Sequence, residues 1–328
     1  MKKLRAASVI VFIACLALLG VSAFKARANK GPGPVIQMDA GVIEVSVNDG
    51  EEALKRGIVV KDAAGNDVTD TLEVESVGPF NEAGHRVVTY VAFDSKNKLA
   101  RAQREVSYTD YTSPRFHFER PLSFPADSAN LLSGVTVVDA FDGVQFNNIW
   151  IQNDEIIDVW MPGEYPVVLE TTNSVGESVS LPVTIEIYDE TARAGLPQIK
   201  LKEYVVYLEQ GAQWNPQQYL DSVVIGGSKF DVAVTGGETA PAQAEGDAVA
   251  TATAEGDAVT LAAGDAVAAA QAAGNVIDAG RINVTGTVNT TVPGNYEVIY
   301  TYEDAENGTG TGSVRLYVVV TERRGAGK

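Results

Sequence analysis

The chain has almost no cysteine and almost no histidine. Its 328 residues include one cysteine, Cys15, and two histidines, His85 and His117. A single cysteine excludes a disulfide framework and a cysteine-based metal site. The sequence also has no G-x-S-x-G nucleophile elbow, and adjacent acids such as Asp154 and Glu155 are typical of solvated turns. The sequence therefore predicts that the protein is not an enzyme.

Basic residues are scarce after the N-terminal segment. All 43 acidic residues lie after position 30, together with only 19 of the 25 basic residues, so residues 31–328 carry a net charge of −24. A surface with this excess of negative charge repels the phosphate backbone of nucleic acids. Nucleic acid is therefore excluded as an expected partner, whereas an extracellular medium suits such a surface.

Only one long hydrophobic run is present, the 19 uncharged residues from Ala6 to Phe24. As a helix it would span ~28 Å at ~1.5 Å per residue, about one bilayer core. Residues 1–30 are therefore expected to form a single-pass anchor with the bulk of the chain outside the cytoplasm, because basic residues precede the run. The alternative is secretion after signal cleavage, since "VSA" at 21–23 and "ARA" at 26–28 satisfy the small-x-small rule. The basic residues before the run are Lys2, Lys3 and Arg5.

A strand-like motif occurs three times. Each copy begins at a glycine, alternates apolar and polar residues, and ends ten residues later at Asp or Asn, which indicates a strand with one buried face. A short polar turn and a second alternating run follow each copy, so each predicts a β-hairpin. Pro182 lies in one of the second runs and predicts an edge position there. The copies are Gly84–Asp94 "GHRVVTYVAFD", Gly163–Asn173 "GEYPVVLETTN" and Gly294–Asp304 "GNYEVIYTYED".

Short strands and frequent turn signals along the rest of the chain predict an all-β protein of three tandem antiparallel β-sandwiches after the N-terminal hydrophobic helix. The expected domains are 36–112, 113–190 and 195–322. "WNPQQYLDSV" predicts one helical turn. Both junctions, "YTDYTSPRF" and "YDETARAGLPQI", are short and contain proline, which favours an end-to-end arrangement.

The third domain has an excess of residues rich in Ala, Gly, Thr and Asp, at about 236–280, with "GDAV" repeated at 246, 256 and 264. This composition offers few large side chains to bury and predicts a flexible, disordered low-complexity insertion. A helix is the alternative, because alanine favours helices, but the repeated glycines would break it.

With these segments in view, the chain resembles the bacterial immunoglobulin-like repeats of Gram-positive cell-surface proteins, of the type named after an Ig-like domain of a pesticidal crystal toxin. "PQIKL" and "VTGTVNTTVPGNYEVIYTYEDAENGTGTGSVRLYVVV" carry the resemblance best, "VVKDAAGNDVTDTLEVES" carries it in the first domain, and "VVDAFDGVQFNNIWI" more loosely in the second. The resemblance implies Ig-like β-sandwiches and a place in adhesins or as spacers, but no activity. Arg86 departs from the pattern, which has tyrosine two places after the glycine.

Two acidic loops are candidates for a weak calcium site, because carboxylate and amide oxygens are ligands that calcium prefers. They occupy matching places upstream of their repeated glycines, and Asp110 or Asp189 at the junctions could add further oxygens. Ordinary turn chemistry is the alternative, since Asp and Asn favour turns. No other cofactor is expected. The loops are "DAAGND", with Asp62, Asn66 and Asp67, and "DAFDG", with Asp139 and Asp142.

Trp214, beside "NPQQY", is the candidate ligand-binding residue because it is expected to be partly exposed, whereas Trp150 and Trp160 are expected to pack in the core. These observations predict a membrane-anchored, extracytoplasmic structural or adhesive stalk of a Gram-positive-type cell surface. Its expected partner is a cell-envelope protein or polysaccharide. A glycan-binding accessory protein of the envelope is the alternative.

Overall fold

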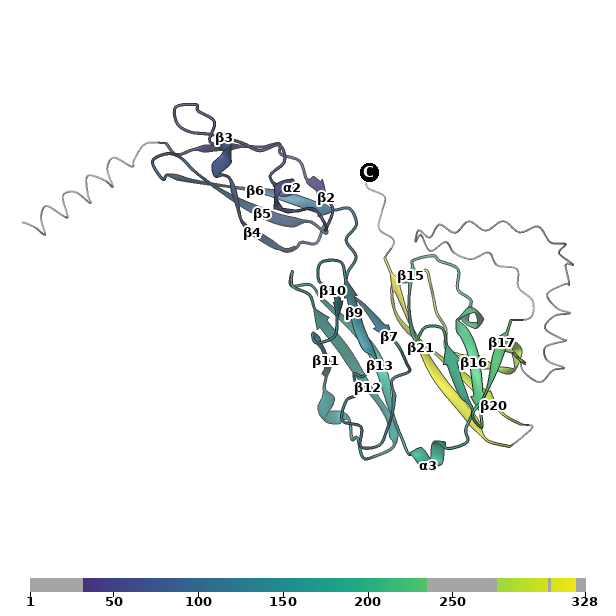
Figure 1. The fold of residues 1–328 in the computed structure, drawn as a ribbon. Coiled ribbons are helices and arrows are strands. Elements are labelled where there is room, and N and C mark those ends of the chain that lie inside the picture. The colour runs from purple at the N-terminus through teal and green to yellow at the C-terminus, as the bar shows by residue number, and fades with distance from the viewer. Residues whose placement is uncertain (1–31, 235–275, 306–307, 323–328) are drawn as a thin grey trace, which may run out of the picture. The chain divides into compact units, whose positions relative to one another are not determined.

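The computed structural model describes residues 32–234, 276–305 and 308–322 (Figure 1). The described residues form six β-sheets and only two α-helices, α2 (Glu51–Leu54) and α3 (Glu190–Arg193), each of four residues. The predicted all-β class is therefore confirmed. The predicted N-terminal helix, Ala6 to Phe24, lies outside the described residues.

In chain order the sheets fall into three pairs. The first sheet pair has β1 (Val35–Gln37) with β3 (Val59–Lys61), and a sheet in the order β2 (Ile43–Val45), β6 (Leu99–Tyr108), β5 (Arg86–Phe93), β4 (Glu73–Phe80). The second has β10 (Gly143–Gln145), β9 (Val135–Asp139), β7 (Arg115–Phe118), and β11 (Ile149–Gln152), β12 (Gly163–Thr172), β13 (Ser178–Tyr188), β8 (Ser123–Pro125). The third has β14 (Gln198–Leu201), β16 (Leu220–Ile225), β17 (Ser228–Ala233), β18 (Val276–Asp278), and β15 (Val205–Glu209), β21 (Thr311–Thr321), β20 (Gly294–Glu303), β19 (Asn283–Thr285).

The three predicted hairpins are present as β5–β6, β12–β13 and β20–β21, each paired antiparallel. Their alternating apolar residues face a core, in which Tyr90, Leu169 and Tyr300 are completely buried. Short 3-10 turns connect other strands, and Pro216–Tyr219 is the single turn predicted from "WNPQQYLDSV". The remaining turns are Thr69–Thr71, Asp154–Ile156 and Ala279–Arg281.

The Asp or Asn that ends each repeated strand organises the hairpin turn that follows. The carboxylate of Asp94 accepts the amides of Lys96 and Lys98, both at 2.8 Å. Asn173 accepts the amide of Glu177 in the corresponding turn at 2.8 Å. Asp94 and Asn173 are each 8% exposed and Asp304 is 2% exposed. Because a buried polar group needs partners, this position tolerates only a short side chain that can accept hydrogen bonds.

The residue two places after each repeated glycine fastens the start of the strand to the backbone before it. The hydroxyls of Tyr165 and Tyr296 donate to carbonyls four residues upstream, Met161 and Val292, both at 2.8 Å. Arg86 takes this place in the first sheet pair. Its guanidinium donates to the carbonyls of Gly78 at 2.7 Å and Val77 at 3.2 Å. A buried arginine therefore replaces the tyrosine and keeps the function of bonding upstream carbonyls.

The chain divides into two compact units. Unit 1 contains the first sheet pair, up to Ser113, together with the loops 139–143 and 173–177. Its core is built on Val60, Val88 and Tyr90. Around Arg86, an aromatic cluster contains Phe80, Tyr108, Tyr111 and Phe141; Phe80 stacks on Tyr111 at 4.5 Å between ring centroids. The Arg86 guanidinium lies 5.7 Å from the Phe80 ring centroid and 5.5 Å from that of Phe141.

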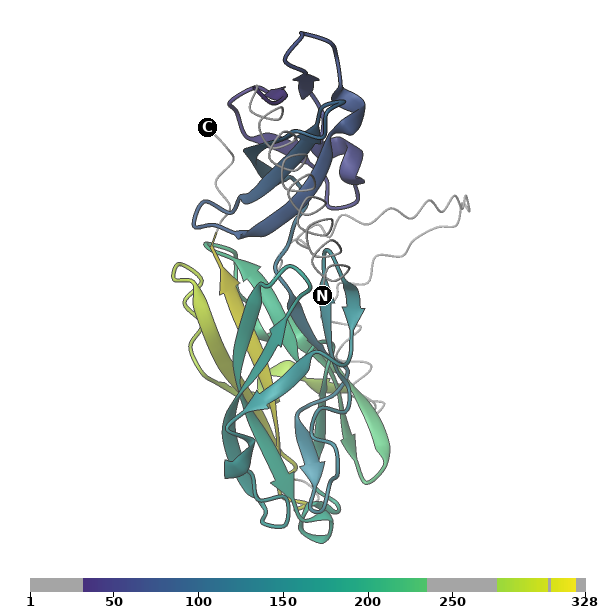
Figure 2. The same ribbon diagram turned by 90° about the vertical axis from the view of Figure 1, so that its left-hand side faces the viewer.

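Unit 2 contains the strands of the second and third sheet pairs. One continuous hydrophobic core includes residues of both, and Figures 1 and 2 show the two pairs side by side. The expected end-to-end arrangement is therefore wrong for these two pairs. The sheet β15-β21-β20-β19 buries residues on both of its faces: Val318 and Leu316 point into the third pair, whereas Tyr317 is 3% exposed on the opposite face, where it meets Phe118 of the second pair at 5.9 Å.

Two tyrosine hydroxyls join the sheet pairs of unit 2 at open strand edges. Tyr317 accepts the amide of Thr184 in β13 and donates to its carbonyl, both at 2.9 Å. Tyr207 of β15 accepts the amide of Phe116, in the edge strand β7, at 2.7 Å. Parallel β8 pairs with β13 only at 186–188, so the edge of β13 at Thr184 is open, and Pro182 shares its side of the strand. The predicted edge position of Pro182 agrees with this geometry.

The connection between these two sheet pairs reverses the chain direction. It contains α3, whose N-cap Asp189 accepts the amides of Thr191 and Ala192. The hydroxyl of Thr191 and these amides hold the pKa of Asp189 below its ordinary value. Gly195 follows with φ +87°, a conformation that favours glycine. The turn that α3 and Gly195 make explains why a short linker with proline does not set the two pairs end to end.

The predicted insertion lies mainly outside the described residues. Its last part is ordered, however, because Val276–Asp278 form β18, which pairs in parallel with β17. Ile277 and Ala279 are buried in the core. The sheet of the third pair therefore resumes at 276, before the expected end of the insertion at about 280, because apolar residues there complete it.

Candidate ligand-binding pocket

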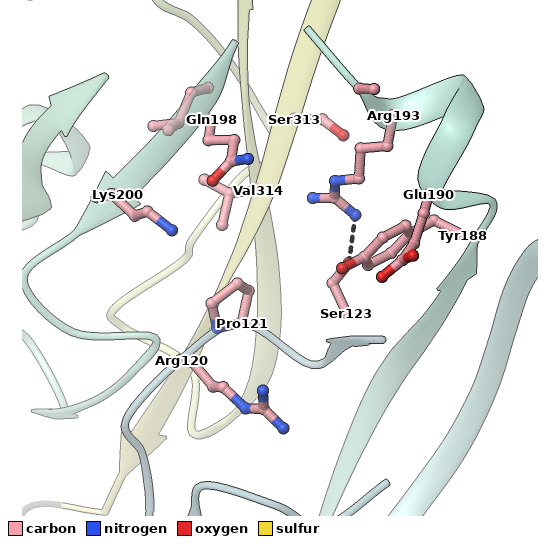
Figure 3. A pocket seen from close by; sticks show the side chains of 12 residues that line it. Arg120, Pro121, Ser123, Tyr188, Glu190, Arg193, Gln198, Lys200, Ser313 and Val314 are labelled. Carbon is pink, nitrogen blue, oxygen red and sulfur yellow. Dashed lines mark hydrogen bonds between the residues drawn. The ribbon is translucent and has the colours of Figure 1, made fainter. Parts of the chain in front are cut away.

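A pocket of about 440 Å³ lies in unit 2 where the second and third sheet pairs meet beside α3. Figure 3 shows side chains reaching into it from both sides: Gln198 and Lys200 from β14, and Arg193 from α3. Its remaining walls come from the segment before β8 with the first residue of β8, the end of β13, α3 and the residue after it, β14 and the start of β21. They are Arg120, Pro121, Ser123, Tyr188, Glu190, Ala194, Ile199, Ser313 and Val314.

Arg193 is the best-anchored cation of the pocket. Its guanidinium donates to the Ser123 hydroxyl and to the Glu186 carboxylate, the latter at 3.0 Å. It also lies 4.2 Å above the centroid of the Tyr188 ring. Ser123 in turn donates to Glu186 at 2.6 Å. This network fixes the position of one positive charge and links α3 to the strands β8 and β13.

Two further cations line the pocket without a carboxylate partner within 4.0 Å among the described residues, Arg120 and Lys200. Arg120 donates through Nε to the carbonyl of Ser133 at 3.0 Å, and its guanidinium lies 5.0 Å from the Phe124 ring centroid. Lys200 is half-buried in β14. Glu190 supplies the one acidic side chain of the lining. The pocket is therefore cationic in a strongly acidic protein, and its geometry suits an anion.

The first predicted calcium loop closes on itself through hydrogen bonds. Asp62 accepts the amides of Ala64 at 2.8 Å and Asn66 at 2.9 Å, and the Asn66 side chain at 3.0 Å. Asp67 accepts the amide and hydroxyl of Thr69 at 2.9 Å and 2.5 Å. The Asn66 side chain is the largest cause of the lowered pKa of Asp62, and the Thr69 hydroxyl of that of Asp67. These contacts are those of ordinary turns.

The second predicted calcium loop belongs to unit 1 and is more buried. Asp139, 3% exposed, accepts the amides of Phe141 at 2.8 Å and Asp142 at 2.9 Å, and the Asn173 side chain at 3.0 Å. Asp142 accepts the amide and hydroxyl of Ser174, with 2.7 Å to the amide. The structure thus brings Asp139 and Asp142 to one pair of loops. In the described parts of the chain, no three His, Cys, Asp or Glu side chains are placed to share a metal ion.

The expectation holds for Trp214, which is partly exposed, and is wrong for Trp150 and Trp160. Trp214 is half-buried and stacks on Tyr219, with ring centroids 5.4 Å apart, so much of its surface serves packing. Trp150 is 42% exposed and Trp160 69% exposed, so the expectation that both pack in the core is wrong. Trp150 lies opposite Glu170 on the outer face of its sheet, while its neighbours Ile149 and Ile151 take the inner positions.

The comparisons with known proteins identify an Ig-like segment. Residues 250–311 match the family model described as a bacterial Ig-like domain (group 3). The match covers β18 to β20 and the first residue of β21, and it begins within the predicted insertion. It confirms the expected resemblance to bacterial Ig-like repeats. No curated protein matches the chain.

Solved structures that match the chain include two of ZmpB from Clostridium perfringens. One, of CBM51-2 in complex with GlcNAc and INT domains, is 15% identical, covers 45% of this chain and 26% of its own, and has a TM-score of 0.19. The other, of the M60 catalytic domain with CBM51-1 and CBM51-2, is 12% identical, covers 88% of this chain and 31% of its own, with a TM-score of 0.21. The chain thus spans less than a third of either structure.

The extracellular domain of protocadherin gammaB4 also matches, at 12% identity, over 89% of this chain and 50% of its own, with a TM-score of 0.16. At such TM-scores these matches carry no argument about ligands or partners. Among the residues that the structure describes, no helix has the length and apolar character needed to cross a membrane.

Sequence reasoning did not identify the pocket. Arg120, Arg193 and Lys200 come from three segments, and no spacing in the sequence relates them. The sequence shows only that basic residues are few in the second and third domains. It does not show that these three come together in space. Since that convergence depends on the chain reversal at α3, the sequence alone could not reveal it.

Proposed function

We propose that the protein is a non-catalytic structural or adhesive component of a Gram-positive-type cell surface, anchored through Ala6 to Phe24 with its bulk outside the cytoplasm. In this proposal the three sheet pairs are three Ig-like domains. The observation that carries it is the bacterial Ig-like match at 250–311, together with the same hairpin in all three pairs. Secretion after signal cleavage is the alternative location.

The shared core of unit 2 bears on the proposed adhesive role. Because the second and third sheet pairs share a core, they form one compact unit. A compact unit loses little conformational entropy on binding, which favours an adhesive surface. The proposed role is therefore adhesive, with the second and third domains acting together as one unit.

The surroundings of the two histidines support the non-catalytic part of the proposal. His85 contacts the carboxylate of Glu105 at 3.0 Å on the surface of a strand pair, with both side chains accessible to solvent. His117 is exposed in β7. Neither histidine lines the pocket described above. A catalytic histidine would be expected beside a nucleophile in a cleft.

The test is retention of the purified full chain on wall glycans and solubilised envelope proteins of the producing organism, with and without calcium. Retention of one envelope protein or one wall polymer, without chemical change to it, would support the proposal. Turnover of any retained polymer would contradict it. Calcium-dependent retention that is lost in Asp139→Asn would assign calcium to the second loop; calcium-independent retention would leave that loop as turn chemistry.

The glycan-binding accessory protein is the second candidate function, and the exposed rings of Trp150 and Trp160 favour it. Aromatic rings offer flat apolar faces for sugar rings. In this case Trp160→Ala should abolish retention on one glycan fraction while leaving the melting temperature unchanged. Trp214→Ala should instead lower stability, because Trp214 packs against Tyr219 and the core. Equal glycan retention by wild type and both variants would contradict the second candidate.

A further inference from the structure

We propose that the pocket beside α3 binds the oxyanion of an acidic saccharide, a carboxylate or a phosphate group. This inference rests on the proposed adhesive function, for which it names the class of ligand. The charge of the lining is the first observation that supports it. Three cations, Arg120, Arg193 and Lys200, line the pocket with one acidic side chain, Glu190, and Arg193 is paired with Glu186, so among the described residues Arg120 and Lys200 supply the positive charge without a carboxylate partner. This excess contrasts with 43 acidic and 19 basic residues over residues 31–328.

The three cations differ in how many of their hydrogen-bond donors are available to an anion. Glu186 and Ser123 already engage Arg193, which holds it in place. Arg120 uses its Nε for the Ser133 carbonyl and keeps its terminal nitrogens for other acceptors. Lys200 has no carboxylate within 4.0 Å in the described chain. Because an oxyanion prefers charged donors that lack a partner, Lys200 and Arg120 are the residues expected to contact it.

The remaining lining suits a sugar rather than a bare ion. The amide of Gln198 and the hydroxyl of Ser313 can bond sugar hydroxyls, while Pro121 and Val314 provide apolar surface. Figure 3 shows Gln198, Ser313 and Val314 near one another, with Pro121 below them in the view. A pocket of about 440 Å³ has room for a monosaccharide, since ligand pockets measure roughly 300–1,000 Å³.

The position of the pocket gives it rigid walls. Lys200 and Gln198 belong to the third sheet pair, whereas Arg120 and Ser123 belong to the second. Tyr317 and Tyr207 bond the two pairs to each other through backbone groups. The opposing walls are therefore held in place before a ligand arrives, which reduces the entropy lost on binding.

The experiment measures binding of three probes to the full chain by calorimetry: glucuronate, inorganic phosphate and neutral glucose. Lys200→Gln and Arg120→Gln should weaken anion binding at least tenfold. The matched control is Lys202→Gln, because Lys202 is exposed just after the same strand, bonds the Gln218 carbonyl and does not line the pocket. Melting temperatures of all variants should match that of the wild type, which excludes unfolding as the cause.

Tighter binding of glucuronate would identify a carboxylate sugar as the source of the anion, and tighter binding of phosphate a phosphorylated one; either supports the inference. Binding of glucose as tight as that of the anions, or equal losses in Lys200→Gln and Lys202→Gln, would overturn it. If the wild type binds anions but no envelope fraction, the adhesive proposal fails, whereas the inference that the pocket binds an anion is supported. If envelope fractions are retained but the wild type binds neither glucuronate nor phosphate, the pocket inference fails and the adhesive proposal stands.

Discussion

The hydroxyl of Tyr317 bonds both the amide and the carbonyl of Thr184, a residue 133 positions earlier in the chain. Tyr317 belongs to the third sheet pair and Thr184 to an open strand edge of the second. One side chain thus satisfies two backbone groups that would otherwise lie at an unpaired edge. Together with the bond from Phe116 to Tyr207, this contact makes the two sheet pairs one unit.

Replacing Tyr317 by phenylalanine should destabilise unit 2. The ring would remain, but both backbone groups of Thr184 would lose their partner in a buried contact, which costs about 1–3 kcal/mol. Urea unfolding of Tyr317→Phe should show this loss. Tyr296→Phe is the control, because its hydroxyl bonds one exposed carbonyl, that of Val292, and its loss should be smaller. Equal effects of the two changes would show that the bonds to Thr184 contribute nothing.

Alkaline pH should weaken unit 2. Burial raises the pKa of Tyr207 to about 12, whereas an unfolded tyrosine ionises near pH ~10. A raised pKa contributes stability that is fully present below pH ~10 and is lost as the pH rises through about 12, because the unfolded state releases its proton first. Unfolding at increasing pH, monitored by circular dichroism, should show this loss. Tyr207→Phe should reduce the slope between these pH values; an unchanged slope would contradict the assignment to Tyr207.

Arg86→Lys should destabilise unit 1 although it conserves the charge. Lysine cannot reproduce the planar donor fork that bonds Gly78 and Val77 or the stacking on Phe80. We expect a loss of about 1–3 kcal/mol in free energy of unfolding. Arg101→Lys is the matched control on the adjacent strand. Its solvent-exposed pair with Glu75 should contribute far less to stability. A larger loss at Arg101 would refute this role of Arg86.

Gly312→Ala should be poorly tolerated because β21 passes very close to the start of the third sheet pair. A Cβ atom at this position would lie 1.8 Å from the carbonyl oxygen of Pro197, so the backbone would have to move. We expect a loss of more than about 2 kcal/mol, measured by thermal unfolding. Gly41→Ala, which has no atom within 4 Å of its Cβ, should be neutral or slightly stabilising. A neutral Gly312→Ala would show that the two strands can separate freely there.

The local structure could be predicted from the sequence because each signal lies within a short stretch. The alternation in "GNYEVIYTYED" and its two counterparts indicates which face of the strand is buried. The terminal Asp or Asn indicates that a turn follows. Pro182 likewise indicated an edge, since a missing N–H is a local property. From these features the three hairpins and the all-β class could be predicted.

The association of the second and third sheet pairs could not be predicted in the same way. Tyr207 and Tyr317 bond backbone atoms, which any residue provides, so their partners leave no trace in the sequence. The apolar run "LYVVV" at 316–320 was the available signal, because it exceeds what one buried face requires. Trp150 shows the converse: its apolar neighbours suggested a core position, but period two places it on the outer face.

Hydrogen exchange at the amides of Thr184 and Phe116 tests whether the second and third sheet pairs form one unit. The acceptor of each amide is a tyrosine hydroxyl of the third pair. Slow exchange is expected at both positions in the wild type. Tyr317→Phe should accelerate exchange at Thr184 alone, and Tyr207→Phe at Phe116 alone. Fast exchange at both amides in the wild type, at the rate of an open strand edge, would contradict it.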